Sequence, residues 1–396
     1  MKEDNMKQGW EIKKLGEVCE VIGGSTPKTN EPTYWDGDFF WVTPAELDGT
    51  KLISSTKRTI TEAGIKSAHL QLLPAGTVLL SSRAPIGKVA ITTVPMYCNQ
   101  GFKNIICSDK LYNCYVYWFL YAKTEYLNAL GTGATFKEIS KKVVEQIPIP
   151  VPPLPVQERI VSELDLLSGI IEKKREQLKE LDALAQSIFY DMFGDPITNE
   201  KGWEVKKLGE VCKVNPSKKD TSIGLSNSDI VSFLPMEDLP IKACYHSPKQ
   251  TRLFSEVQSS YTCFANNDVL MAKVTPCFEN GKIGIASNLM NGIGYGSSEF
   301  IVIRANNIDV IKEYPYFVIQ NTSFIENACA QLTGTSGLRR VPRQYVENCN
   351  ISIPPLPLQH QFATKIEAIE KQKELIKQSI SETETLFNAR MQHYFN

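Results

Sequence analysis

The most regular feature of this 396-residue sequence is an apolar pattern with a period of 3.5 residues, which occurs twice. Alternating steps of four and three residues from Ile160 meet ten positions, nine of them apolar, and the same steps from Phe362 meet seven apolar positions in ten. This period is typical of a helix that buries one stripe against another helix. The predicted helix–helix contacts are Leu164, Leu167, Ile171, Leu178, Leu181 and Ile188 in the first helix and Ile366, Ile369, Ile376, Ile380 and Phe387 in the second.

Both predicted helices have signals at their ends. Pro155 and Pro357 follow proline-rich runs and stand where the first turn of a helix tolerates proline. The first helix is expected to stop at Gly194, with Pro196 beyond it. Two such stripes in one chain most simply bury each other, as an antiparallel coiled coil. The alternative is that each helix packs on its own globular domain, but a strict 3.5-residue period favours the pair.

The remainder of the chain predicts an α+β fold. Residues 113–130 predict a helix, and short apolar runs bounded by Gly, Pro and Ser predict strands at 39–42, 77–81, 88–92 and 102–107. The expected organisation is two similar globular domains separated by the long helices. The boundaries are predicted at 1–155 for the first domain, 156–195 for the first helix, 196–356 for the second domain and 357–396 for the second helix.

Two segments recur almost unchanged, which indicates a duplication. "WEIKKLGEVC" (Trp10–Cys19) returns 193 positions later as "WEVKKLGEVC" (Trp203–Cys212), and "PPLPVQ" (Pro152–Gln157) returns as "PPLPLQ" (Pro354–Gln359). A period near 200 residues is too long for a solenoid repeat. We interpret the chain as a pseudo-two-fold duplication of one unit, a globular domain followed by a long helix. The decapeptide is predicted to form a strand and a turn that lead into each domain.

Composition narrows the class of protein. A hydrophobic content of 42% with 22% charged residues is that of a soluble globular protein. No run approaches the ~20 apolar residues of a membrane span, and the N-terminus has no apolar signal core. The ten cysteines contain no C-x-x-C pair, and the four histidines are scattered. We therefore expect a reduced, cytoplasmic setting with buried thiols, and neither a disulfide framework nor a metal site.

No motif in the sequence indicates catalysis. The N-P-P-[YF] motif of amino-group methyltransferases is absent, since the nearest string is "NPSK" at Asn215–Lys218. Neither Gly-Lys pair belongs to a P-loop motif. The E-x-K of the repeated decapeptide could hold Mg²⁺ in a nuclease, but alternation along a surface strand explains it better. We expect no catalytic residue in this chain.

Binding loops are the better candidates for function. The net charge of −1 means that any contact with nucleic acid must use local patches or a partner's charge. In both halves, the turn between two predicted strands and the loop after the short helix mix hydroxyls with Lys and Arg, which suits contacts with phosphates and base edges. The alternative is a set of solvated surface loops. The candidate DNA-binding residues are Ser82, Arg83, Lys88, Thr135, Lys137, Lys273, Thr275, Lys282, Ser336, Arg339, Arg340 and Arg343.

Taken together, these features resemble the specificity subunits of type I restriction–modification systems. The resemblance covers essentially the whole chain and rests on the order and duplication of "WEIKKLGEVCEVIGGSTP", "SSRAPIGKVAI", "NQGFKNI" and "IPVPPLPVQERIVSELD". It implies that each globular domain is a target-recognition domain that reads one half of a bipartite, asymmetric DNA site. It also implies that the helices set the spacing between the halves and dock methyltransferase subunits.

The same resemblance implies partners and cofactors. The chain would be the non-catalytic part of an adenine DNA methyltransferase and restriction endonuclease complex. Its partners would be double-stranded DNA, two methyltransferase subunits and, through that core, restriction (motor) subunits, with no membrane. No cofactor is expected on this chain, since S-adenosylmethionine would bind the methyltransferase partner and ATP and Mg²⁺ the restriction partner. The alternative function is a coiled-coil scaffold that joins protein partners without reading DNA.

Overall fold

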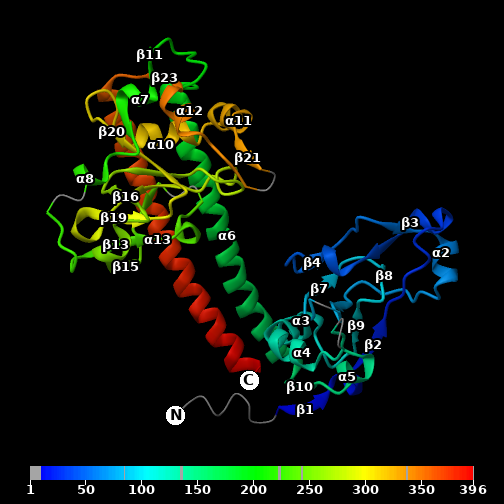
Figure 1. Cartoon of the computed structure of the whole chain (residues 1–396). Helices are drawn as coiled ribbons and strands as arrows, with labels where there is room; N and C mark the ends of the chain where they lie inside the picture. The colour runs from blue at the N-terminus through cyan, green and yellow to red at the C-terminus, as the bar shows by residue number, and fades with distance from the viewer. Residues whose placement is uncertain are drawn as a thin grey trace, which may run out of the picture. The chain divides into compact units, whose positions relative to one another are not determined.

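The computed structural model describes residues 10–395 except 84, 134–136, 222–223, 242–243 and 336–337. Contacts divide the chain into two compact units: unit 1 comprises residues 1–173 and 380–396, and unit 2 comprises residues 174–379. The two long helices are α6 (Leu154–Phe193) and α13 (Leu356–Phe395), seen in green and red in Figure 1. Each of these helices therefore contributes one segment to each unit.

Unit 1 contains three small sheets. Its strands are β1 (Glu11–Lys14), β2 (Cys19–Gly23), β3 (Trp35–Val42), β4 (Leu52–Ile53), β5 (Thr59–Ile60), β6 (Val78–Leu80), β7 (Val89–Thr92), β8 (Tyr97–Cys98), β9 (Lys103–Cys107) and β10 (Pro148–Val151). They form a β1–β10 pair, a five-stranded sheet of order β2–β9–β6–β7–β4 and a three-stranded sheet of order β5–β3–β8. The shorter α-helices are α1 (Leu15–Val18), α2 (Glu62–Ser67), α3 (Asn113–Ala122), α4 (Thr124–Leu130) and α5 (Lys141–Glu145). Two 3-10 helices are labelled η1 (Pro32–Tyr34) and η2 (Pro44–Glu46).

Unit 2 repeats this plan. Its strands are β11 (Glu204–Lys207), β12 (Cys212–Val214), β13 (Ile230–Leu234), β14 (Tyr245–His246), β15 (Gln250–Leu253), β16 (Thr262–Ala265), β17 (Val269–Ala272), β18 (Ile283–Ala286), β19 (Ile293–Gly296), β20 (Phe300–Ala305), β21 (Thr333–Thr335), β22 (Leu338–Arg340) and β23 (Asn350–Ile353). The shorter helices are α7 (Leu208–Val211), α8 (Lys218–Thr221), η3 (Met236–Asp238), α9 (Phe254–Val257), η4 (Met290–Gly292), α10 (Glu313–Ile319), α11 (Thr322–Ala330) and α12 (Arg343–Asn348).

The sheet orders show the duplication directly. Unit 2 has a β11–β23 pair and a five-stranded sheet of order β12–β20–β17–β18–β14, which matches the order in unit 1 strand for strand. Its smaller sheet, β15–β13–β19–β16, has one strand more, and β21 and β22 form a further hairpin. The predicted α+β fold and its duplication are confirmed.

One predicted helix is wrong in detail. Residues 113–130 form two helices, α3 and α4, with Lys123 between them at φ −97° and ψ 14°. The Thr124 hydroxyl donates a hydrogen bond to the Tyr121 carbonyl at 2.8 Å. A local side-chain bond of this kind competes with the helical backbone pattern. The four predicted strands, in contrast, overlap β3, β6, β7 and β9, although β3 begins four residues before the predicted start, at Trp35.

The two repeated motifs lie side by side in each unit. The decapeptide begins with β1 or β11, and each of these strands pairs antiparallel with the strand that leads into a long helix. Glu11 lies opposite Val151 in unit 1, and Glu204 lies opposite Ile353 in unit 2. The start and the end of each globular part are thus joined at the first turn of its helix. This pairing explains why both motifs recur together.

A buried glutamine in the first turn of each long helix forms hydrogen bonds with the globular part that precedes the helix. Gln157, the last residue of "PPLPVQ", is fully buried. Its Nε2 donates to the carbonyls of Lys110 (2.9 Å) and Pro152 (2.8 Å), and its Oε1 accepts from the Tyr112 N–H (2.9 Å). A buried amide with every group paired holds one orientation, because each broken bond would leave a polar group unsatisfied.

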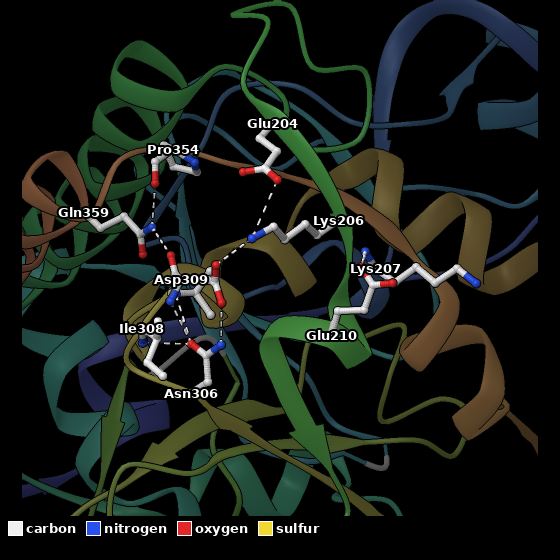
Figure 2. Close-up of polar contacts among 10 residues, drawn as sticks. Glu204, Lys206, Lys207, Glu210, Asn306, Ile308, Asp309, Pro354 and Gln359 are labelled. Atoms are coloured by element: carbon white, nitrogen blue, oxygen red, sulfur yellow. Dashed lines mark hydrogen bonds and ion pairs between the residues drawn. The ribbon is translucent and has the colours of Figure 1, made fainter.

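Gln359 makes the equivalent bonds in unit 2. Its Nε2 donates to the carbonyls of Asp309 and Pro354, both at 2.8 Å, and its Oε1 accepts from the Ile311 N–H at 3.1 Å. The Asp309 carboxylate also accepts a hydrogen bond from Lys206 Nζ of the repeated decapeptide, at 2.7 Å. This contact is drawn in Figure 2. Asp309 therefore connects the two repeated motifs of unit 2.

Within unit 2 the two long helices run antiparallel. The Phe189 and Phe362 rings lie 5.6 Å apart, and further along the pair Lys373 Nζ lies 2.6 Å from Asp182 Oδ1. Lys373 occupies a position of the apolar stripe and is buried, with Glu370 as its second partner at 2.6 Å. Burial alone would lower the pKa of this lysine, but the hydrogen bonds to Asp182 and Glu370 raise it.

The apolar stripe packs against the globular parts as well as against the other helix. None of the eleven predicted contact residues is exposed. In unit 2, the Phe317 ring of α10 stacks on Phe189 and meets the Phe362 ring edge to face. In unit 1, Phe387 lies 5.5 Å from Trp118 of α3. Packing on the domain, the alternative arrangement, therefore coexists with helix pairing.

Replacing Gln359 by Glu is expected to lower the free energy of unfolding by about 2–4 kcal/mol near pH 8, because a carboxylate oxygen would face two carbonyl oxygens. This environment raises the pKa of the introduced acid above its unfolded value, and the neutral acid can still donate one hydrogen bond. The destabilisation is therefore smaller at pH 5 and grows as the pH rises. Urea unfolding of the full chain at both pH values measures it.

The matched control is Gln177→Glu, which introduces the same charge at an exposed position of α6. Equal stability of the two variants at pH 8 would contradict a structural role for Gln359.

Candidate nucleic-acid interface

In unit 2 the two predicted loops meet. Val274 forms a bridge with Arg340, and the Val341 N–H donates to the Lys273 carbonyl at 2.8 Å. The Thr275 N–H donates to the Arg339 carbonyl at 2.9 Å, and its hydroxyl accepts from the Arg339 N–H at 3.1 Å. We call residues 273–275 and 339–341 the junction of unit 2.

Unit 1 has the same arrangement. Arg83, in the turn between β6 and β7, forms a bridge with Glu138, and the Ile139 N–H donates to the Ser82 carbonyl at 2.9 Å. We call residues 82–83 and 138–139 the junction of unit 1. Lys137 is exposed beside it, and the candidate Thr135 lies outside the described residues. Both junctions thus join the two segments in which the sequence predicted DNA contacts.

An ion-pair cluster lies at the junction of unit 1. Glu138 accepts hydrogen bonds from Arg83 Nε (2.9 Å) and Lys103 Nζ (3.1 Å). Partial burial alone would raise the pKa of Glu138, but these two cations hold it below its usual value. The carboxylate is therefore charged at neutral pH and neutralises much of the local positive charge.

The junction of unit 2 also has a cluster of one glutamate and two cations, but here the glutamate lies on a different segment. Arg340 donates two hydrogen bonds to Glu299, both at 2.9 Å, and Lys273 Nζ lies 3.9 Å from the same carboxylate. The bonds from Arg340 lower the pKa of Glu299. A planar guanidinium bound at two points is fixed in orientation as well as in charge.

Glu138 and Arg340 occupy equivalent backbone positions. Each pairs with the turn between the two central strands and with a threonine at the start of its own loop, Thr132 or Thr333. Unit 1 has a negatively charged glutamate at this position, and unit 2 has a positively charged arginine. The two units therefore share a strand order but differ in side-chain charge at an equivalent position of the junction.

Burial separates the candidate residues into two groups. Ser82 and Thr275 are buried, so their hydroxyls face the protein in this conformation. Lys88 and Lys282 hold the turns in place, through hydrogen bonds of 2.8 Å to the carbonyls of Leu47 and Met236. Lys137, Arg83, Arg339 and Arg343 are exposed, and the side chains of the three arginines are at least 45% exposed.

The most available cation at either junction is Arg339. Its only ion-pair contact among the described residues is with Glu279, at 3.8 Å. Arg343, in contrast, binds Glu347 of its own helix at 2.7 Å. The candidate Ser336 lies outside the described residues. Arg339 therefore has weaker internal competition for an external anion than Arg343.

Sequence reasoning missed the acids. Glu138 follows Lys137 directly, and Glu299 stands in "GSSEF" before β20, so both were visible. Their role depends on partners far away in sequence, such as Arg83, which is 55 residues from Glu138. No local pattern indicates such a pair.

Metal-binding groups and membrane-spanning helices are both absent from the described residues. Within them, no group of three or more His, Cys, Asp or Glu side chains is placed to hold a metal ion. No helix found in that same part of the chain is long and apolar enough to cross a membrane.

Comparison with known proteins gives matches to both units. A family model described as "Type I restriction modification DNA specificity domain" matches residues 7–182 and, again, residues 200–385. The type I restriction enzyme MjaIX specificity subunit of Methanocaldococcus jannaschii is 29% identical over 381 residues, which cover 91% of this chain and 86% of that protein. The EcoAI specificity subunit of Escherichia coli is 33% identical over 200 residues, which cover half of this chain and 33% of that protein.

Solved structures with a similar fold match over almost the whole chain. A chain from a study of type I R-M system assembly has a TM-score of 0.58 at 17% identity, and the alignment covers 98% of both chains. The type I restriction–modification S subunit from M. genitalium has a TM-score of 0.55 at 10% identity, with 98% of this chain and 96% of that chain covered. At these identities the likeness shows the fold.

Replacing Arg340 by Gln is expected to lower the melting temperature by about one to three degrees at neutral pH, a small effect because the pair is partly exposed. The folded-state pKa of Glu299 is lowered, so the pair stabilises the fold above the ordinary carboxyl range and loses this effect as the pH falls through the lowered pKa. The difference from the wild type should shrink from about pH 6 to about pH 3.5 in thermal unfolding. A difference that stays constant over this range would contradict the assignment.

Proposed function

Because the chain belongs to the type I restriction modification DNA specificity family, we propose that its two units are target-recognition domains, each of which reads one half of a bipartite, asymmetric DNA site. The observation that supports this proposal best is the change of charge at one equivalent backbone position of the two junctions. The strand order is the same in both units, but Glu138 in unit 1 is replaced by Arg340 in unit 2. A common scaffold with different contact loops suits two different half-sites.

The charge distribution supports a shared role in DNA binding. The net charge is −1, and Glu138 and Glu299 neutralise cations at the junctions. A chain with few free cations releases few counterions from DNA, so it should bind weakly by itself. We propose that methyltransferase subunits supply much of the phosphate contact.

Exposed leucines on the long helices support a docking role for them. Leu184 and Leu386 stand at equivalent positions of the repeat, on α6 and α13, and are 48% and 47% exposed. The helical segments of unit 1 also expose Leu166, and those of unit 2 expose Leu375. An apolar surface that occurs once in each unit suits two copies of one partner. The proposed stoichiometry is two methyltransferase subunits for one copy of this chain.

The chemistry is proposed to belong to the partners. The methyltransferase subunits would bind S-adenosylmethionine and methylate adenine, and restriction subunits that join this core would use ATP and Mg²⁺. This chain would contribute specificity, in the cytoplasm, without a cofactor of its own.

A map of methylated bases tests the proposal. The chain is expressed with its methyltransferase partner in a host without adenine methylation, and modified bases are sequenced genome-wide. The expected result is one asymmetric motif of two short half-sites with a fixed gap, which disappears when this chain is omitted. A complex that purifies intact but methylates no motif would favour the alternative function, a coiled-coil scaffold that joins protein partners without reading DNA.

The double variant Arg339→Ala, Arg340→Ala is expected to abolish or relax recognition of one half-site in this map, while the other half-site and the assembly of the complex persist. Loss of these cations removes the exposed charge of the junction of unit 2. Lys249→Ala, which removes an exposed cation elsewhere in unit 2, is the control. Loss of assembly in the double variant would assign the two arginines to a protein interface.

Replacing Leu184 by Glu is expected to reduce the number of methyltransferase subunits bound from two to one, because a charge would enter one of two equivalent apolar contacts. Leu386→Glu should have the same effect, and the two together should leave the chain unbound. The mass of the purified complex measures the stoichiometry. Unchanged mass in both single variants would place the docking surface elsewhere.

A further inference from the structure

Each unit has one exposed arginine stacked on an aromatic ring of its smaller sheet. The guanidinium carbon of Arg58 lies 3.6 Å from the centroid of the Trp35 ring, and that of Arg252 lies 3.8 Å from the Phe233 ring. A second ring stands near each one, Trp41 at 5.7 Å and Tyr261 at 5.9 Å. These sites are separate from the two junctions described above.

The two arginines occupy corresponding places in the fold. Arg58 directly precedes β5, which pairs antiparallel with β3, the strand of Trp35. Arg252 lies in β15, which pairs antiparallel with β13, the strand of Phe233. In each case a short helix follows, α2 or α9. The ring differs between the units and the arginine is not at the same register, yet the stacked pair occurs in both.

Neither guanidinium has an acidic partner in the part of the chain that the structure describes. This distinguishes Arg58 and Arg252 from the arginines that lie within 2.9 Å of a carboxylate, which are Arg83, Arg304, Arg340, Arg343 and Arg390. The net charge of the chain is −1, so acidic residues slightly outnumber basic ones. Two exposed arginines without a carboxylate partner therefore differ from the paired arginines of the same chain.

Stacking prepares such an arginine to bind an anion. The ring covers one flat face of the guanidinium and attracts the cation, but it does not neutralise the charge. The N–H donors lie at the edge of the group, where they stay available for a planar, two-point contact. The side chain is already held in one place, so less conformational entropy is lost when an anion binds.

We propose that Arg58 and Arg252 each bind a phosphate of the DNA backbone, beside the half-site that the same unit reads. This inference rests on the proposed function, since it assumes that DNA is the ligand of both units. It adds a site in each smaller sheet, outside the loops in which the sequence predicted DNA contacts.

A phosphate suits the observations better than a base. At one equivalent position of the junctions, unit 1 has Glu138 and unit 2 has Arg340, as expected where each unit reads different bases. The stacked arginine occurs in both units despite different rings and registers. A feature that both units share suits a ligand that is the same at every site, and the backbone phosphate is that ligand.

The test uses the full chain assembled with its methyltransferase partner. The dissociation constant of the complex is measured for a duplex that contains the recognition motif found in the methylation map. It is also measured for a duplex of scrambled sequence, and both measurements are repeated over a series of salt concentrations. Arg58→Ala and Arg252→Ala should each weaken binding about tenfold. Each should also reduce the slope of log K against log salt by about 0.9, the value for one phosphate contact.

Three features separate a phosphate contact from other roles. The loss should be the same for both duplexes, the methylated motif should not change, and the two substitutions together should add, because they lie in different units. Arg58→Lys keeps the charge and should retain the wild-type slope. Lys66→Ala is the control, since Lys66 is exposed on the neighbouring α2 but is paired with Glu62.

The outcomes that overturn the inference are distinct from failure of the proposed function. If the wild-type complex binds the motif no better than the scrambled duplex, the proposed function fails and this inference fails with it. If the wild type discriminates but both alanine variants keep its salt slope, only this inference fails. A lower melting temperature with an unchanged slope would assign the arginines a purely structural role.

Discussion

The structure depends on an apolar stripe that two helices share between two units. Each of α6 and α13 contributes one segment to unit 1 and another to unit 2. In unit 2, Phe189 and Phe362 join the same aromatic cluster from different helices. In unit 1, Phe387 and Phe395 of α13 pack on α3. Neither unit therefore has a complete core without residues from both helices, and burial of this stripe holds distant parts of the chain in one fold.

The buried glutamines turn this packing into a defined geometry. Apolar contacts alone are non-directional and tolerate small rotations of a helix. Gln157 and Gln359 add hydrogen bonds that are satisfied in one orientation only, at the first turn of each helix. The direction in which a helix leaves its globular part is thus set by one side chain, and the repeated motif provides that side chain twice.

Much of the fold follows from local patterns, whereas the candidate sites do not. The long helices, the strands β3, β6, β7 and β9 and the duplication could be predicted because each depends on periodicity or repetition within a short stretch. The break at Lys123 is accompanied by a hydrogen bond from the Thr124 hydroxyl to the Tyr121 carbonyl, which helix propensity does not reveal. The charge clusters at the junctions and the stacked arginines join residues that are distant in sequence, such as Arg83 and Glu138. Their chemistry appears only when the chain is folded.

The division of the chain between the units also orders events during synthesis. Unit 2 is formed by the continuous stretch 174–379, so all of it is translated before residues 380–396. Unit 1 begins first but takes residues 380–396 into its core, where Phe395 meets Tyr115. Residues 1–173 are therefore translated first, but their core is complete only when residues 380–396 follow. Until then the aromatic side chains of α3 lack the packing of Phe387 and Phe395, and exposed apolar surface of this kind favours aggregation.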